Sequence, residues 1–382
     1  MSCRRSSAAL GTVSIGAAAA VLAGCTSTAP TQDAAGGGQI TVNATDSSCE
    51  ISTTAAPAGN ISFHVTNGGS KVTEFYLYGA GDRIMGEVEN IGPGLSRDLR
   101  VEVPDGGTYT TACKPGMVGD GIRAPFTVTG NAQRQTDQNA KLAEATAGYT
   151  RYITSQSGAL VTQTTEFANA VKAKDVNKAK SLYPVARTYY ERIEPVAESF
   201  GDLDPKIDGR EDDDREPGVQ WTGYHRLEKD LWVDGLKADS PKVADTLVAD
   251  VTDLKDRIPS LKLTPVQLAN GAKELLDEVA TGKVTGEEDR YSHTDLYDFK
   301  ANVEGSQAAV SALRPVIDEK DKQLGATLDQ RFAAVEKLLE GYRQGDGFVL
   351  YTSLTGDDKK KMTAAVDALS EPVSKVAGAV TA

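Results

Sequence analysis

The spacing of apolar residues changes once along this chain, and that change constrains its fold more than any other feature. Between residues 39 and 130, short runs such as ISFHVTN and VTEFYLYG are rich in β-branched and aromatic residues, and Gly, Pro and Asn turns separate them. From residue 137 to the end, runs such as LDQRFAAVEKLLEGYRQG repeat apolar residues at helical spacing. We therefore predict a multidomain chain, with a small all-β antiparallel sandwich at 39–130 followed by an all-α helical bundle at 137–382.

The N-terminal residues have the features of an export signal. Arg4 and Arg5 precede the apolar run GTVSIGAAAAVLAGC, which is too short to span a membrane but suits a signal peptide. The end of this run, LAGC, resembles the bacterial lipobox, whose cysteine is lipidated. We expect a lipoprotein signal peptide at 1–24, lipidation of Cys25, a flexible tether at 25–38 and a folded part that is anchored outside the cytoplasm by lipid only. The alternative is an ordinary secretory peptide with an incidental cysteine.

The net charge of the chain, −13 over 382 residues, narrows the class of partner. Nucleic acid is not expected, because phosphate binding needs clustered Lys and Arg side chains. An acidic chain is better suited to binding cations.

Apart from Cys3 in the signal peptide and the lipidation site Cys25, two cysteines remain, Cys49 and Cys113. Such a pair is expected to form a disulfide in an oxidising compartment, but two thiolates would also suit a soft ion such as copper. The stretch YTTACKPGMVGDG resembles the cupredoxin loop in which a Cys and a Met bind copper, and Cys113 and Met117 fit those positions. The histidine between them is missing, and His64 falls on the alternate face of its strand. A blue-copper centre is therefore not supported, although copper at the cysteine pair stays open.

Carboxylates are the other candidate ligands in the β region. Glu74 lies near the end of a strand, and Glu87 and Glu89 are two residues apart, on one face of an extended segment. Hard oxygen donors of this kind suit ferrous or ferric iron. The alternative is that these are solvated surface glutamates.

The stretch WTGYHRLEKDLW holds the main candidate for a metal site in the helical region. Residues i and i+3 share a helix face, so His225 and Glu228 can reach one ion together. The zinc-protease motif H-E-x-x-H is absent, because Arg226 follows the histidine and Lys229 stands where the second histidine would be. The alternative is a hydrogen-bonded core histidine without a metal.

Two further acidic stretches of the helical region supply candidate ligands. YYERIEPVAES carries Glu191 and Glu194 at a spacing that shares one helix face, and EEDRYSHTDLYDF carries Asp298 among aromatic residues. If these stretches converge with the H-x-x-E helix, they form a carboxylate and imidazole site of the kind found in iron-binding bundles. The acidic stretch FGDLDPKIDGREDDDREPG fails the EF-hand pattern, and we expect it to be a solvated loop.

Taken together, these stretches resemble a known family. SLYPVARTYYERIEPVAESFGDLDPKIDGRED, WTGYHRLEKDLW and GEEDRYSHTDLYDFKANVEGS look like an imelysin-type (M75) domain with its H-x-x-E motif. A cupredoxin-like domain and an export signal precede them, which is the order found in the EfeO family. The resemblance implies a protein that captures iron outside the cell and supplies it to an EfeU-type permease, with an EfeB-type haem peroxidase as the third component.

The resemblance also implies roles for particular residues. In the imelysin-like part, His225 and Glu228 fill the H-x-x-E motif. In the cupredoxin-like part, it implies a cysteine pair and acidic positions proposed for iron, which are filled here by Cys49, Cys113, Glu74, Glu87 and Glu89.

Two other classes of function stay open. Imelysin-type domains are also classed by name with peptidases, so a metallopeptidase that uses His225 and Glu228 is the enzyme alternative, which the absent H-E-x-x-H motif disfavours. A protein that binds an anionic polysaccharide is the third class, which the net charge disfavours. We expect a non-enzymatic iron-binding protein.

Overall fold

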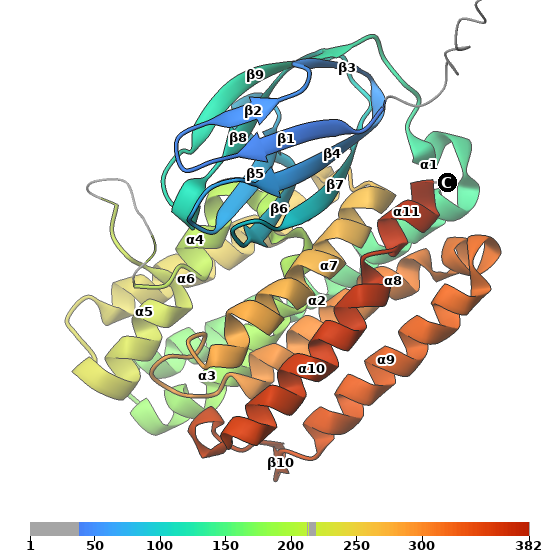
Figure 1. Cartoon of the computed structure of the whole chain (residues 1–382). Helices are drawn as coiled ribbons and strands as arrows, with labels where there is room; N and C mark the ends of the chain where they lie inside the picture. The colour runs from blue at the N-terminus through green and yellow to red at the C-terminus, as the bar shows by residue number, and fades with distance from the viewer. Residues whose placement is uncertain (1–37, 212, 214–218, 382) are drawn as a thin grey trace, which may run out of the picture. The chain divides into compact units, whose positions relative to one another are not determined.

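The computed structural model describes residues 38–211, 213 and 219–381, and Figure 1 shows their helices and strands. The predicted signal peptide, the lipidation site Cys25 and all but the last residue of the predicted tether lie outside the described residues. Within the described residues, the helices are all too short or too polar to cross a membrane.

The β region forms a sandwich of two sheets, with strand orders β2-β1-β4-β7 and β3-β9-β8-β5-β6. Most neighbouring strands are antiparallel, as predicted, but β1 pairs with β4 and β3 with β9 in parallel. Side chains alternate between the two faces of a strand in parallel and in antiparallel sheets alike, so the sequence pattern could not show that these two pairs are parallel. The strands are β1 (Ile40–Ala44), β2 (Cys49–Ile51), β3 (Ala55–Pro57), β4 (Gly59–Asn67), β5 (Thr73–Tyr78), β6 (Ile84–Ile91), β7 (Ser96–Val103), β8 (Gly107–Cys113) and β9 (Ile122–Thr129).

Aromatic side chains and a disulfide join the two sheets. Phe63 of β4 is fully buried and packs against Phe75 and Phe126 of the other sheet, with ring centroids 5.1 and 5.6 Å apart. A disulfide between Cys49 and Cys113 connects β2 to β8. The apolar face of each sheet is therefore covered by the other.

The region after the sandwich is helical, as predicted, apart from one short hairpin of β10 (Arg343–Gln344) and β11 (Gly347–Phe348). Long helix α2 packs against α3, α6 and α8, and α7 packs against α8 and α10. The helices are α1 (Gln135–Gln138), α2 (Ala140–Lys172), α3 (Val176–Glu191), α4 (Asp204–Ile207), α5 (Gly223–Lys229), α6 (Ser240–Arg257), α7 (Pro265–Thr281), α8 (Leu296–Lys320), α9 (Lys322–Glu340), α10 (Gly356–Val373) and α11 (Val376–Thr381). The predicted fold class, a β-sandwich followed by an all-helical region, is confirmed.

Local signals explain where several of these helices begin. The Thr264 hydroxyl accepts a hydrogen bond from the N–H of Gln267, and the Gln267 side chain accepts one from the N–H of Thr264, which caps α7. Thr355 and Asp358 form the same arrangement at the start of α10. Each of these capping boxes gives hydrogen-bond acceptors to backbone N–H groups that the first turn of a helix leaves without partners.

Candidate metal centre

Helix α5 holds the H-x-x-E pair in the interior of the helical region. His225 is 2% exposed and Glu228 is fully buried, and Nδ1 of the imidazole lies 3.2 Å from Oε2 of the glutamate. The helix begins at Gly223, whose φ of 89° favours glycine. A Cβ at Gly223 would lie 2.3 Å from the carbonyl oxygen of Ile207, so only glycine allows α5 to begin this close to the end of α4. The shared helix face that the spacing predicted is observed.

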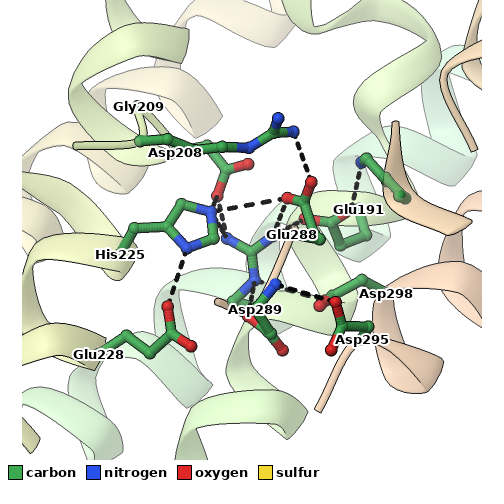
Figure 2. Close-up of polar contacts among 12 residues, drawn as sticks. Glu191, Asp208, Gly209, His225, Glu228, Glu288, Asp289, Asp295 and Asp298 are labelled. Carbon is green, nitrogen blue, oxygen red and sulfur yellow. Dashed lines mark hydrogen bonds and ion pairs between the residues drawn. The ribbon is translucent and has the colours of Figure 1, made fainter. Parts of the chain in front are cut away.

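Backbone N–H groups orient the Glu228 carboxylate. Its Oε1 accepts hydrogen bonds from the N–H of Tyr291 at 3.0 Å and from the N–H of Ser292 at 2.7 Å. Oε2 is thereby directed at His225, as Figure 2 shows. A carboxylate fixed in this way is already oriented before any ion arrives.

A buried arginine lies next to the histidine. Arg187 of α3 is fully buried, and its Nη1 is 3.1 Å from Nε2 of His225. One guanidinium can neutralise only one carboxylate, yet this one contacts several. Its ion-pair partners are Glu191, Asp208, Glu288, Asp289 and Asp298.

Among the described residues, two sets of three side chains could each hold a cation, and His225 belongs to both. Within each set the ligand atoms lie within 4.8 Å of one another. One set adds Glu228 and Asp289 to the histidine, and the other adds Asp208 and Glu288, each with an oxygen 3.6 Å from Nε2. An ion placed among such atoms would lie about 2.0–2.2 Å from each nitrogen or carboxylate ligand after small side-chain movements.

The surrounding charges set the protonation state of the histidine. Burial and Arg187 act to lower the pKa of His225, but Asp208, Glu228 and Glu288 outweigh them and raise it to about 10. The imidazole is therefore protonated and positively charged at neutral pH. The imidazolium and the Arg187 guanidinium are then two adjacent cations, and the surrounding carboxylates hold them together. An ion that binds this imidazole must displace a proton.

The carboxyl groups of the centre fall into two electrostatic classes. Burial acts to raise the pKa of Glu228 and of Glu288, but neighbouring cations outweigh it and hold both pKa values below their ordinary range. For Asp289 and Asp298, burial and a nearby carboxylate outweigh Arg187, and both pKa values rise. The centre thus combines carboxyl groups whose ionised form is favoured with carboxyl groups whose protonated form is favoured.

Lys283 organises a second buried charge cluster around two of the predicted ligands. Its Nζ lies 3.0 Å from Glu191 and 2.9 Å from both oxygens of Glu194, and Asn302 donates to both glutamates. The prediction that these glutamates share one helix face was wrong, because α3 ends at Glu191 and Glu194 begins a separate 3-10 segment at Glu194–Leu203. Glu191 links the two clusters, since it also contacts Arg187.

Arg187, Asp208 and Asp289 belong to the centre but were not predicted from the sequence. Asp208 belongs to the stretch predicted as a solvated loop, and that prediction was wrong for this residue, because only 12% of its side chain is exposed. Residues 200–207 of the stretch instead belong to the 3-10 segment and α4, which bring Asp208 to the histidine. Helical spacing could have identified Arg187, which stands four residues before Glu191 on the same face of α3.

In the β region, the residues that could have bound copper have other partners. Cys49 and Cys113 form a disulfide, which leaves no thiolate for a metal. His64 pairs through Nδ1 with Asp98 at 2.7 Å, and its side chain is 39% exposed. These residues do not fit a copper–thiolate centre.

The acidic residues predicted in the β region lie close together. Glu74 and Glu89 each place a carboxylate oxygen 3.0 Å from the hydroxyl of Tyr76. Glu87 lies opposite Tyr76 on the neighbouring strand and is 2% exposed. They are not the solvated surface glutamates of the alternative interpretation, since Glu74 and Glu87 are buried and Glu89 is half-buried.

Comparison with known proteins identifies relatives over most of the chain. Residues 145–376 match the imelysin family, and residues 15–128 match the cupredoxin-like domain family. The "Iron uptake system component EfeO" of Escherichia coli O1:K1 is 40% identical over 345 residues, which cover 89% of this chain and 91% of that protein. Proteins of the same name from Escherichia coli K12 and Shigella flexneri are each 39% identical over 345 residues, with the same coverage.

One solved structure has a weaker likeness. Dithionite-reduced auracyanin from Roseiflexus castenholzii is 17% identical, with a TM-score of 0.22, and the match covers 25% of this chain and 100% of auracyanin. A likeness of that size carries no argument about the site.

Proposed function

We propose, from the premise that this chain belongs to the EfeO family, that it is the extracytoplasmic iron-binding component of an iron-uptake system. The observation that supports this most is the buried centre around His225, where an imidazole, a preoriented Glu228 carboxylate and further carboxylates converge. Iron would be the cargo of this centre.

In this proposal, His225, Glu228 and Asp289 bind the ion through imidazole nitrogen and carboxylate oxygen, the donor types that suit iron. Asp208 and Glu288 form the second set, and Asp208 is its most exposed member. We propose that the ion first meets this second set and then moves to the first.

Arg187 supplies positive charge in the position that the ion would approach. Its guanidinium contacts members of both sets, including Glu288 at 2.9 Å and Asp289 at 3.6 Å. A guanidinium and a metal ion repel each other at such distances. Iron binding therefore requires Arg187 to give up some of these contacts, and the arginine keeps the carboxylates paired when no ion is bound.

The remaining predicted ligands act in the outer part of the centre. Glu191 and Asp298 contact Arg187, and Glu194 contacts Lys283. We propose that these carboxylates hold the two buried cations in place while the ion is bound or released.

The finer steps of uptake follow from the family rather than from the geometry. We propose that the chain is tethered to the membrane through lipidated Cys25 and delivers iron to an EfeU-type permease, in a system with an EfeB-type haem peroxidase. In the β region, we propose that Glu74, Glu87 and Glu89 take part in acquiring iron.

The metallopeptidase alternative has less support from the centre. A zinc peptidase needs an open coordination position, a substrate cleft and a glutamate free to act as a base. Glu228 is instead fully buried, and one of its oxygens accepts hydrogen bonds from two backbone N–H groups.

Iron titration of the mature full-length chain tests the proposal. His225→Ala should reduce the number of tightly bound iron ions by one per chain. His64→Ala is the matched control, because His64 also pairs with a carboxylate but lies at the surface of the β region. Iron binding by His225→Ala that equals that of the control would refute the role of this centre.

A further inference from the structure

Helices α2 and α8 line a groove, and the described residues around it are all different from those of the His225 centre. Its volume is 520 Å³, within the range of about 300–1,000 Å³ that is usual for small-molecule sites. Ala145 and Gly148 of α2 and Ala308 and Ala312 of α8 line it with small side chains or none, so the helix backbones form much of its walls. We call this space the α2–α8 groove.

A buried tyrosine that lines the α2–α8 groove has a hydroxyl without a partner. Tyr149 is 1% exposed, and its hydroxyl forms no hydrogen bond with any described residue. Buried hydroxyl groups nearly always have a partner, so an unpaired one beside a cavity indicates a place for a ligand group. The ring centroid of Tyr149 lies 5.7 Å from that of Tyr152, which also lines the groove, so the two rings give the ligand an aromatic surface.

A proline in α8 makes a second polar group available to the groove. In an α-helix the N–H of residue 315 would donate to the carbonyl of residue 311, but Pro315 has no N–H. The carbonyl of Ser311 therefore lacks its helical donor, and both residues line the groove. Apolar walls with a few polar groups that can form hydrogen bonds are the usual composition of a small-molecule site.

The charges at the rim of the groove are already paired. Nζ of Lys141 lies 2.5 Å from the Glu319 carboxylate, and the Glu144 carboxylate lies 2.6 Å from the Arg151 guanidinium. A charged ligand must compete with these pairs, whereas a neutral ligand leaves both intact. The rim therefore favours an uncharged molecule.

We infer that the α2–α8 groove binds a small, uncharged aromatic molecule that carries a hydroxyl group. The ring of this ligand packs against the Tyr149 and Tyr152 rings, because aromatic rings attract one another in offset and edge contacts. Its hydroxyl group accepts a hydrogen bond from Tyr149 and has a proton left for the Ser311 carbonyl. The site is separate from the proposed iron-binding function and does not rest on it.

Titration of the mature full-length chain with beta-naphthol, followed by the fluorescence of this probe, tests the inference. The wild type should bind the probe saturably. Tyr149→Phe keeps the ring but removes the hydroxyl, so affinity for beta-naphthol should fall about two- to tenfold while affinity for naphthalene stays the same. The melting temperature of Tyr149→Phe should not fall, because the hydroxyl has no hydrogen bond to a described residue.

A glycine of α2 provides a variant that fills the groove and keeps the helix. Apart from its chain neighbours and helix backbone, the nearest described atom to a Cβ at Gly148 would be Nη2 of Arg151, at 3.5 Å. Gly148→Leu should therefore fold, place its side chain in the groove and abolish binding of beta-naphthol. The matched control is Gly158→Leu, which makes the same change in the same helix outside the groove and should bind the probe like the wild type.

Three results would overturn the inference: no saturable binding by the wild type, equal binding by the two leucine variants, or unchanged beta-naphthol affinity in Tyr149→Phe. The alternative occupant of the groove is a helix of a second copy of the chain. Sedimentation tests this alternative, because a dimer that Gly148→Leu dissociates and Gly158→Leu does not would assign the groove to that contact. Iron is absent from all of these measurements, so none of their results bears on the proposed function.

Discussion

Replacing Arg187 by methionine tests the electrostatic account of the buried centre. Methionine keeps most of the apolar volume of the side chain but removes the charge. In the metal-free protein, the change leaves Glu288 and Asp298, which lie 2.9 and 3.4 Å from the guanidinium, without that cation. The carboxyl groups must then take up protons or remain as uncompensated buried charges.

The size of this effect follows from the burial of both partners. Arg187, Glu191 and Glu288 are at most 1% exposed, so solvent screens their interaction weakly. Removing one partner of a buried ion pair costs about 3–5 kcal/mol. For a region of this size, about 2–4 °C of melting temperature is lost per kcal/mol, so the melting temperature should fall by roughly 6–20 °C.

A metal ion should then restore stability. Manganese(II) is a redox-stable substitute for ferrous iron, and at a concentration of about 100 times its dissociation constant it would return about 2.7 kcal/mol. Manganese should therefore raise the melting temperature of Arg187→Met more than that of the wild type, because no guanidinium competes for the carboxylates.

Urea unfolding and thermal melting with and without manganese provide the assay. Arg314→Met is the control, since Arg314 pairs with Asp318 and Asp329 at the surface and its loss should cost less than about 1 kcal/mol. The reasoning would be refuted if both variants lost the same stability, or if manganese stabilised Arg187→Met no more than the wild type.

Three further predictions concern the same chain. Lys283→Met should lower the unfolding free energy by about 3 kcal/mol, measured by urea unfolding, because it leaves buried Glu191 without its lysine. Iron affinity should rise about tenfold per unit between about pH 6 and pH 8, because the pKa of His225 is raised to about 10 and the ion must displace that proton; titrations across this range that show no dependence would contradict it. Replacing Cys49 and Cys113 by serine should cost about 4 kcal/mol, since the bond spans 64 residues, and dithiothreitol should destabilise only the wild type in a melting assay.

Local patterns predicted those parts of the structure that local forces determine. The alternation in ISFHVTN and the helical spacing in LDQRFAAVEKLLEGYRQG were sufficient to predict a sandwich followed by helices, because each element buries a face set by its own period. The approach of His225 to Glu228 was also predictable, since both belong to one helical turn. The direction of the β1–β4 pair was not, because it depends on the path of the chain between strands.

Which residues form the centre around His225 is decided by contacts between segments that are distant in the sequence, and local patterns do not show these contacts. Asp208 was assigned to a solvated loop because its neighbours are acidic, yet the close approach of Gly223 to Ile207 brings that segment to the histidine. The break after Glu191 separates Glu194 from the expected helix face, and Pro195 was the available signal. The sequence alone does not show whether an acidic residue will lie at the surface or will pair with a buried cation, as Asp208 does with Arg187.

Anomalous diffraction at the iron absorption edge, from crystals of the full chain loaded with iron, tests the central claim most directly. The account predicts a peak about 2.0–2.2 Å from a nitrogen of His225, with a Glu228 oxygen also in the coordination sphere. His225→Ala crystals prepared in the same way should lack this peak. Iron bound stoichiometrically in the wild type with no peak beside His225 would contradict the account.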